Sequence, residues 1–377
     1  MKKKSEQMRL LEETKPASTS PEVELNEENF LCVLQTLDSL NDHTKLKKAA
    51  NDLKDIVTGV RSEEADIFRL NEEETTFSVR RDILLSELDQ IAEAHTIARS
   101  KYYVERLIKQ IQKPKTSKIN DINLSRWKEY DDIITDSLWI FDRRDNSGVH
   151  LASYWGNFVP QIPHQTILRF TKKKDWVLDT FVGSGTSLIE CRRLGRNGIG
   201  IELNAEVARG AKELIEQAPN PQHIFTDVVI GDSRSIDYRA LLKRHGINDV
   251  QLLIMHPPYF DIIKFSEDEE DLSNATNVED FLLMFRAIVE KATPVLEKGR
   301  FLVLVIGDKY SAGEWIPLGF HCMNEVLKCG YILKSIVVKN FEETRGKRNQ
   351  KELWRYRALV GGFYVFKHEY VMLFKKT

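Results

Sequence analysis

The feature that most constrains the fold is a regular alternation of short β-rich runs and helical stretches after about residue 150. The β-rich runs predict seven strands, at Trp176–Leu178, Gly198–Glu202, Val228–Ile230, Gln251–Met255, Phe301–Ile306, Ile332–Val338 and Tyr370–Phe374. Helical spacing of apolar residues predicts helices between them, at 186–194, 204–217, 236–244, 278–292 and 316–328. This alternation is typical of an α/β fold with a mostly parallel sheet. We expect no strong helix between the last two strands, which predicts an antiparallel pair.

The first third of the chain has a different texture. Its apolar residues recur at helical spacing, and Gly59 is the only glycine before Gly148, so helices are favoured over strands and tight turns. We predict a mobile polar tail at 1–25 and a helical region at 26–120 that is structural, dimerising or DNA-reading. A second domain is expected at 135–377.

Charge and composition exclude several classes of protein. The chain has 55 basic and 57 acidic side chains, so a uniformly basic DNA-coating protein is excluded and any nucleic-acid contact needs a local patch. No apolar run is long enough for a membrane span, and the N-terminal lysines precede no apolar segment typical of a secretory signal. The four cysteines lack metal-type spacing. We therefore expect a cytoplasmic protein with reduced thiols and no metal site.

A glycine-containing segment follows the first predicted strand and opens a helix. It reads DTFVGSGT from Asp179 to Thr186, and Gly183 and Gly185 allow a tight turn and a close approach to a ligand. In a doubly wound sheet this position holds a nucleotide-like cofactor. The segment is neither a P-loop nor a full dinucleotide fingerprint, and an ordinary turn remains the alternative.

Two acidic residues end the next two strands. Glu202 lies about twenty residues beyond the glycine segment, where an acidic side chain accepts the hydroxyls of a ribose. Asp232 follows the third strand and could accept a hydrogen bond from an adenine amino group, although an ordinary turn aspartate would look the same.

The fourth strand is followed directly by His256, Pro257, Pro258 and Tyr259. The two prolines fix an extended backbone and lack N–H donors, which leaves carbonyl acceptors beside a polar side chain and an aromatic ring. A flipped nucleobase needs such acceptors for its exocyclic amine and a ring for stacking. A loop that merely ends a strand is the alternative.

The motifs DTFVGSGT, GIGIE, GDS and HPPY, in this order, resemble those of S-adenosylmethionine-dependent DNA amino-methyltransferases. The segment from Tyr154 to Pro163, with Asn157, resembles the family's segment that helps to hold the methionine end of the cofactor. The resemblance covers roughly 135–377 and implies a Rossmann-like seven-stranded methyltransferase sheet, S-adenosylmethionine as cofactor and transfer to adenine N6 or cytosine N4 of double-stranded DNA. It implies these cofactor residues: Tyr154, Asn157, Pro163, Asp179, Phe181, Gly183, Gly185, Thr186, Glu202 and Asp232.

His256 stands where the family usually has Asp, Asn or Ser, which leaves the methylated base open. A neutral imidazole can accept one hydrogen bond, so its role as acceptor is chemically reasonable. An RNA base methyltransferase and a non-catalytic cofactor- or DNA-binding subunit remain the alternatives.

DNA contacts are expected from a basic insertion at 339–367, where aromatic residues lie between the basic ones. Its predicted DNA-binding residues are Arg345, Lys347, Arg348, Lys351, Arg355 and Arg357. A solvated charged loop is the alternative. The resemblance further implies a restriction-modification or related system, with a second copy of the chain or a cognate restriction enzyme as partner.

Overall fold

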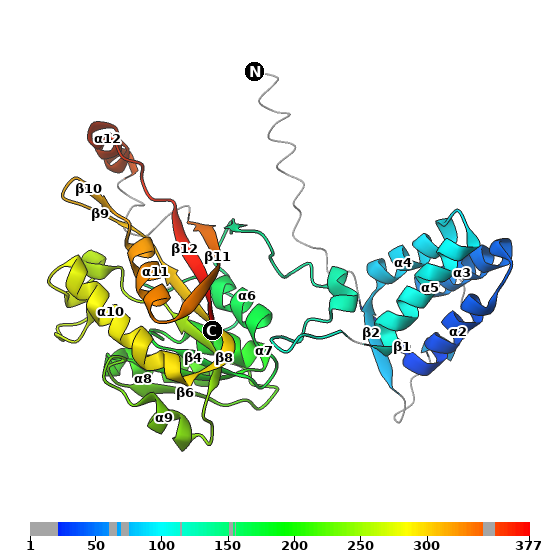
Figure 1. Cartoon of the computed structure of the whole chain (residues 1–377), viewed down its shortest axis with the longest axis horizontal. Helices are drawn as coiled ribbons and strands as arrows, with labels where there is room; N and C mark the ends of the chain where they lie inside the picture. The colour runs from blue at the N-terminus through cyan, green and yellow to red at the C-terminus, as the bar shows by residue number, and fades with distance from the viewer. Residues whose placement is uncertain are drawn as a thin grey trace. The chain divides into compact units, whose positions relative to one another are not determined.

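The structure is a computed structural model that describes residues 22–59, 66–68, 75–113, 115–150, 154, 156–341 and 351–377. The chain forms two compact units (Figure 1). One comprises Met1–Lys118 with Ile122–Asp132, and the other comprises Ile119–Asp121 with Ile133–Thr377.

The larger unit is built on an eight-stranded sheet with the order β3-β11-β12-β8-β7-β4-β5-β6. Its strands are β3 (Leu138–Trp139), β4 (Trp176–Asp179), β5 (Asn197–Glu202), β6 (Thr226–Ile230), β7 (Val250–Met255), β8 (Leu296–Ile306), β11 (Tyr331–Asn340) and β12 (His368–Lys376). Only β12 runs antiparallel to its neighbours among these strands. The predicted seven-stranded α/β sheet and its antiparallel last pair are confirmed, and the two-residue edge strand β3 is additional.

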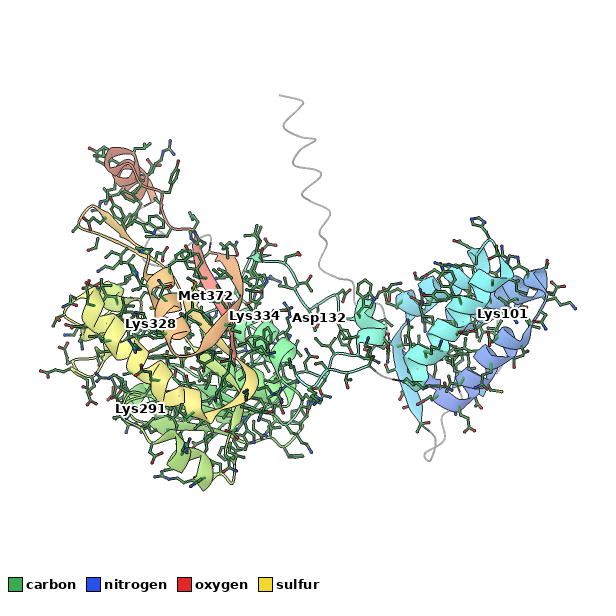
Figure 2. The ribbon with its side chains drawn as sticks, in the orientation of Figure 1. Lys101, Asp132, Lys291, Lys328, Lys334 and Met372 are labelled. Carbon is green, nitrogen blue, oxygen red and sulfur yellow. The ribbon has the colours of Figure 1, made fainter. Side chains whose placement is uncertain are left out.

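Helices cover both faces of this sheet because successive residues of each buried strand point to opposite sides. Val177 packs with α6 (Gln161–Phe170), α7 (Thr186–Leu194) and α8 (Ala205–Gln217). Its neighbour Leu178 packs with α9 (Tyr238–Arg244), α10 (Val278–Ala292) and α11 (Leu318–Lys328). Met372, labelled in Figure 2, lies within β12 and is fully buried. The result is a three-layer α/β/α sandwich.

The ends of the strands place several loops at one edge of the sheet. Asp179 at the end of β4 pairs with Ile254 of β7, and Met255 at the end of β7 pairs with Leu304 of β8. Because β12 is antiparallel, its first residues lie at the same edge as the last residues of the parallel strands. Ligands of open α/β sheets bind outside this carboxyl edge.

Two further elements lie beyond the carboxyl edge. A hairpin of β9 (Lys309–Ser311) and β10 (Glu314–Ile316) follows β8, and α12 (Lys351–Gly361) connects β11 to β12. The expectation of no strong helix between the last two strands was therefore wrong, because α12 forms although none of its described side chains is buried. Phe363, just after α12, stacks on Tyr310 of the hairpin with ring centroids 3.9 Å apart.

The described part of the smaller unit contains four α-helices, α2 (Glu27–Ser39), α3 (His43–Thr58), α4 (Arg81–Glu93) and α5 (Ile97–Gln112). It also contains an antiparallel pair that was not expected, β1 (Glu22–Asn26) and β2 (Thr76–Arg80). Residues 22–25, assigned to the tail, are thus part of a strand, because Val23 and Leu25 alternate with glutamates and bury one face. The rest of the predicted tail lies outside the described residues.

Short 3-10 helices complete the elements, at Asp66–Phe68, Leu124–Glu129, Phe260–Ile262, Leu272–Asn274 and Thr293–Val295. Within the described ranges, each helix is too short or too polar to cross a bilayer. The same residues contain no group of three or more His, Cys, Asp or Glu side chains placed to hold a metal ion.

Candidate active site

The glycine loop, residues 179–186, is held in place by its own first residue. Asp179 is buried, and its carboxylate accepts hydrogen bonds from the Phe181 N–H, at 2.9 Å, and from the Ser187 hydroxyl. Burial raises the pKa of this carboxyl to about 6, although both hydrogen bonds oppose the rise. Asp179 therefore fixes the turn between β4 and α7 through these two hydrogen bonds.

The two glycines of the loop are required by its geometry. Gly183 and Gly185 have φ values of +52° and +87°, which side chains with a Cβ rarely adopt. A Cβ on Gly183 would lie 3.0 Å from the Tyr154 ring, and one on Gly185 would lie 2.8 Å from Ile215. The predicted residues Tyr154 and Gly183 are thus neighbours.

Asn157 joins the preceding segment to the glycine loop. Its Oδ1 accepts hydrogen bonds from the Ser184 hydroxyl at 2.7 Å and from the Thr186 hydroxyl at 3.5 Å. Pro163 is not part of this group of contacts, because it is buried in the first turn of α6, where its carbonyl accepts from Thr166. Tyr154 and Asn157 therefore lie at the glycine loop as predicted, whereas Pro163 is buried in α6.

Glu202 links the glycine loop to the next strand. One carboxylate oxygen accepts the Gly183 N–H and the other accepts the Asn204 N–H, each at 3.0 Å. Burial raises the pKa of this carboxyl, with the two backbone hydrogen bonds acting in the opposite direction. Each oxygen has a second lone pair, so the carboxylate can still accept two hydroxyl groups.

Asp232 lies at the end of the third parallel strand, one strand further along the edge. Its Oδ1 accepts a hydrogen bond from the Arg234 N–H at 2.9 Å, and the second oxygen remains an acceptor of the kind that an amino group needs. The acceptors at Glu202 and Asp232 therefore match the ribose and adenine of a nucleoside. This donor and acceptor chemistry fits S-adenosylmethionine, which contains such a nucleoside.

The tetrapeptide His256–Tyr259 follows β7, the neighbour of β4. The His256 ring lies against Phe158, with centroids 4.8 Å apart, and burial lowers the pKa of this imidazole to about 4. His256 is therefore neutral near pH 7 and has one N–H and one acceptor nitrogen. The Tyr259 ring passes over Gly307, where a Cβ would lie 2.9 Å from the ring.

Two charged residues, from strands far away in the sequence, lie beside the tetrapeptide at the carboxyl edge of the sheet. The Tyr259 hydroxyl donates to Glu369 Oε2 at 2.7 Å, and Lys339 Nζ donates to Glu369 Oε1 at 3.0 Å. Lys339 and Glu369 are only 4% and 8% exposed and lie directly opposite each other on β11 and β12. Sequence reasoning did not assign either of them to the site. The available signal was only that Lys339 directly follows the predicted strand Ile332–Val338 and that Glu369 directly precedes the predicted strand Tyr370–Phe374.

The predicted DNA-binding residues are only partly described. Arg345, Lys347 and Arg348 lie outside the described residues, and Lys351 is the first residue of α12. Arg355 and Arg357 are exposed on α12, and the Arg357 guanidinium lies 5.3 Å from the centroid of the Trp354 ring. Leu359 and Val360 of the same helix are each 71% exposed. α12 thus presents basic and apolar groups beyond the carboxyl edge.

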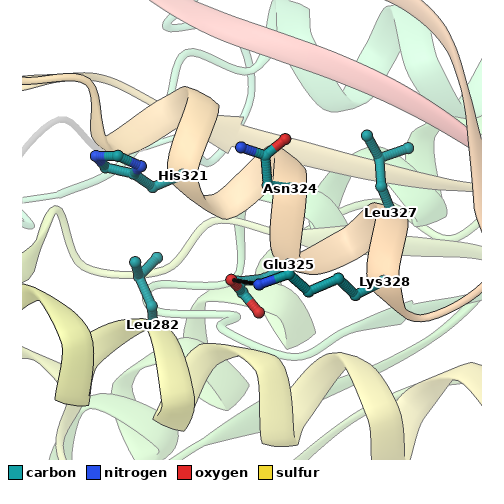
Figure 3. A pocket seen from close by; sticks show the side chains of 6 residues that line it. All are labelled: Leu282, His321, Asn324, Glu325, Leu327 and Lys328. Carbon is teal, nitrogen blue, oxygen red and sulfur yellow. Dashed lines mark hydrogen bonds and ion pairs between the residues drawn. The ribbon is translucent and has the colours of Figure 1, made fainter.

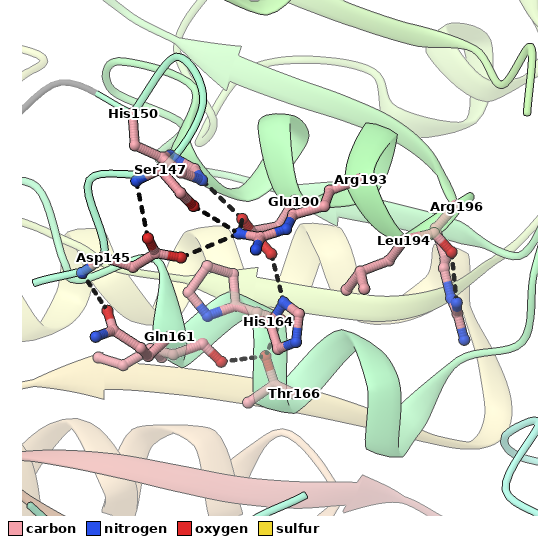
Figure 4. A network of polar contacts seen from close by, with 12 residues as sticks. Asp145, Ser147, His150, Gln161, His164, Thr166, Glu190, Arg193, Leu194 and Arg196 are labelled. Atoms are coloured by element: carbon pink, nitrogen blue, oxygen red, sulfur yellow. Dashed lines mark hydrogen bonds and ion pairs between the residues drawn. The ribbon is translucent and has the colours of Figure 1, made fainter. Parts of the chain in front are cut away.

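A buried polar cluster includes Glu190 of α7, the helix that follows the glycine loop (Figure 4). Glu190 of α7 is fully buried and accepts hydrogen bonds from His150 Nε2 and His164 Nδ1, both at 2.7 Å. Burial acts to raise the pKa of the Glu190 carboxyl, but these hydrogen bonds together with nearby positive charge, including that of Arg193, lower it to about 2. His164 belongs to α6, so the cluster ties α6 and the preceding segment to the helix that starts at the loop.

A surface hollow between α10 and α11 lies apart from these groups (Figure 3). It is lined by Leu282, His321, Asn324, Glu325, Leu327 and Lys328. Lys328 and Glu325 form an ion pair within it. None of its residues was predicted to be functional, and the chemistry of the carboxyl edge lies elsewhere.

Comparisons with known proteins agree with the predicted class. Residues 59–213 match the model of the DNA methylase family, a range that includes the glycine loop and Glu202 and ends before His256. A Type II methyltransferase of Methanocaldococcus jannaschii, M.MjaII, is 39% identical over 57 residues, or 15% of this chain and 10% of the relative. Another from Haemophilus parainfluenzae, M.HpaI, is 46% identical over 54 residues, or 14% and 17%.

The resemblance to the DNA amino-methyltransferases is thus confirmed, over short stretches. The chain spans less than a fifth of the length of these two relatives. Among solved structures, a TehB-like S-adenosylmethionine-dependent methyltransferase from Corynebacterium glutamicum is 14% identical with a TM-score of 0.35. That match covers 57% of this chain and 88% of the other.

Proposed function

We propose that the chain transfers a methyl group from S-adenosylmethionine to the exocyclic amine of a flipped base in double-stranded DNA. The single observation that carries the proposal is the arrangement along one sheet edge. The glycine loop begins at the last residue of β4, and Glu202 is the last residue of β5. The His256–Tyr259 tetrapeptide directly follows β7, which pairs with β4 on its other side. A nucleoside-binding half and an amine-accepting half are therefore neighbours.

In the cofactor half, this chain's residues bind and orient. Glu202 would accept the ribose hydroxyls, Asp232 the adenine amine, and Tyr154 and Asn157 would lie at the methionine end. When bound, S-adenosylmethionine would supply a methyl carbon that the amine nitrogen can attack in line; the bond from this carbon to the positively charged sulfur would break as the N–C bond forms, with its electron pair left on sulfur, and the amine would release one proton to water. Because the loop is already fixed by Asp179 and Glu202, little reorganisation is needed on binding.

In the tetrapeptide half, the residues prepare the amine. The lone pair of an exocyclic amine is conjugated into the base, which makes the nitrogen a poor nucleophile. Acceptors on His256 and on the Pro257 carbonyl would hold its two hydrogens and favour a tetrahedral nitrogen. Pro258 keeps the backbone extended, and the Tyr259 ring is the expected stacking surface for the base. Adenine N6 and cytosine N4 both satisfy this arrangement.

The proposal is tested by transfer of an isotope-labelled methyl group to unmethylated genomic DNA and, in parallel, to total RNA. Mass spectrometry of the digested nucleosides identifies the product. Labelled N6-methyladenine or N4-methylcytosine in DNA is the expected result and identifies the base. Label only in RNA, or no label while the cofactor still binds, would contradict the proposal.

We further propose that α12 binds DNA phosphates. The double substitution R355A/R357A should weaken DNA binding and make the dependence of log affinity on log salt shallower, by roughly 0.9 for each phosphate that is no longer neutralised. A matched control is K243A/R244A, two exposed basic residues at the end of α9. An unchanged slope for R355A/R357A would contradict the assignment.

The cellular setting is part of the same proposal. We expect the protein to act in the cytoplasm, within a restriction-modification or related system, with a second copy of itself or a cognate restriction enzyme as partner. Sedimentation of the chain alone and with DNA distinguishes a homodimer from a monomer. Protection of methylated DNA from a co-encoded nuclease tests the second partner.

A further inference from the structure

Four side chains form a linear chain of hydrogen bonds at the carboxyl edge of the sheet. Lys339 Nζ lies 3.0 Å from Glu369 Oε1, and Tyr259 Oη lies 2.7 Å from Glu369 Oε2. At the other end, His256 Nε2 lies 3.2 Å from Tyr259 Oη. The chain therefore runs from an ammonium group, through a carboxylate and a phenol, to an imidazole.

The direction of each hydrogen bond follows from the chemistry of the groups. Lys339 has only donors, and an ionised Glu369 has only acceptors. Burial disfavours ionisation of Glu369, but the charge of Lys339 and the hydrogen bonds that Tyr259 and Lys339 donate act against it, and the pKa of this carboxyl is lowered. Burial and the adjacent carboxylate raise the pKa of the Tyr259 phenol, so it stays protonated. Tyr259 must then donate its only proton to Glu369.

This direction determines the proton position on His256. With its hydrogen directed to Glu369, the Tyr259 oxygen can only accept from the imidazole, so Nε2 carries the hydrogen. Because the ring is neutral near pH 7, Nδ1 then has a free lone pair. Within the described part of the chain, Nδ1 has no hydrogen-bond partner.

We propose that Glu369 and Lys339 are positioning residues that hold His256 in the Nε2–H tautomer, so that Nδ1 accepts a hydrogen bond from the exocyclic amine of the base. The role of Nδ1 rests on the function proposed above, whereas the tautomer does not. In the opposite tautomer, an N–H at Nδ1 would face the N–H groups of the amine, and the acceptor would be lost. The orienting residues thus make a ring nitrogen of His256 a hydrogen-bond acceptor. A carboxylate or amide oxygen is such an acceptor without any orienting partner.

The substitution Glu369→Gln separates this role from simple packing. Gln has one acceptor and one donor group, and donor-only Lys339 requires the acceptor. The amide NH₂ would then donate to Tyr259, which would turn its own hydrogen towards His256 Nε2. The tautomer of His256 should therefore invert while the side-chain volume hardly changes.

The tautomer is measured directly by long-range ¹H–¹⁵N correlation of the histidine rings in the full-length protein without cofactor or DNA. The His256 signals are identified by their disappearance in H256N. The wild type should show Nε2 protonated and Nδ1 unprotonated. E369Q should move the ring towards Nδ1–H, and Y259F, which breaks the chain, should give a mixture.

Glu87→Gln is the matched control, because Glu87 is also buried and paired with a lysine, Lys128, in the other unit. It should leave the His256 signals unchanged. A wild-type protein with Nδ1 protonated would overturn the proposal, and this result does not depend on the folding of any variant. A folded E369Q with an unchanged tautomer would overturn it as well.

Kinetics connect the tautomer to the reaction. E369Q should lower kcat for DNA methylation by roughly tenfold or more, with an unchanged KM for the cofactor. In an H256N background, where the amide oxygen is an acceptor in any case, E369Q should have much less effect. An equal reduction of kcat in both backgrounds would contradict the positioning role. Absence of methylation together with the expected tautomer would contradict only the proposed function.

Discussion

The two halves of the carboxyl edge are held in place by different means. In the cofactor half, Asp179 and Glu202 bond mainly to backbone N–H groups within about twenty residues of themselves. In the tetrapeptide half, Tyr259 bonds to Glu369, which is 110 residues away in the sequence, and Glu369 bonds to Lys339 on another strand. A local motif positions the first half, and the completed sheet positions the second.

This difference determines which substitutions each half tolerates. Backbone hydrogen bonds within a loop form whenever the loop forms, so the cofactor half should tolerate changes in the last strands. A buried ion pair between β11 and β12 depends on both partners, since one buried charge without the other is costly. We therefore expect substitutions in the two halves to differ in both the size and the kind of their effects.

Lys339→Met should have the largest effect. It leaves the buried Glu369 carboxylate without its cation, which costs roughly 3–5 kcal/mol of unfolding free energy. Urea unfolding measures the decrease, and the double variant K339M/E369Q should recover part of it. A decrease below about 1 kcal/mol, the range of surface ion pairs, would contradict the importance of this pair.

The pH dependence of stability should show the buried His256. Its pKa is about 4 in the folded chain against an ordinary value of 6.5, so the unfolded chain binds a proton that the folded chain does not. Stability from this group is complete above pH 6.5 and declines as the pH falls towards 4, by up to about 3 kcal/mol.

The measurement compares the wild type with H256N across this range. The comparison is needed because Asp179, with its pKa raised to about 6, acts in the opposite direction between pH 6 and 4. The stability difference between the two proteins isolates the histidine. If that difference does not change with pH, His256 is not held neutral by burial.

Gly307→Ala should disturb the tetrapeptide half alone. The new Cβ would lie 2.9 Å from the Tyr259 ring, and such overpacking costs roughly 1–3 kcal/mol. We expect a lower kcat for methyl transfer and an unchanged dissociation constant for the cofactor by calorimetry. Weaker cofactor binding in G307A would show that the two halves are not separate.

Thr180→Val should have the smallest effect and concerns the cofactor half. The Thr180 hydroxyl is buried, and no hydrogen-bond partner for it occurs in the described part of the chain. Replacing it by a methyl group removes an unsatisfied polar atom and should stabilise the protein by about 1 kcal/mol. A cofactor affinity that falls in this variant would instead assign the hydroxyl to the ligand.

The same contrast explains what could be predicted from the sequence. The glycine loop, Glu202 and the strand–helix alternation are local patterns, and the structure contains them where they were expected. The roles of Lys339 and Glu369 arise only when β11 pairs with β12 and β12 with β8, which no local spacing encodes. Strands β1 and β2 were missed for the same kind of reason. Each is only five residues long, and its pairing partner lies about fifty residues away in the sequence, so no local pattern predicts the pair.

The most direct test of the account compares Glu202→Ala with His256→Ala in cofactor titration and single-turnover methyl transfer to DNA. E202A should bind S-adenosylmethionine roughly ten- to hundredfold more weakly and recover transfer at saturating cofactor. H256A should bind it as the wild type does and transfer the methyl group about a hundredfold or more slowly at any cofactor concentration. Wild-type transfer by H256A, or the same defect in both variants, would contradict the division of the edge into two halves.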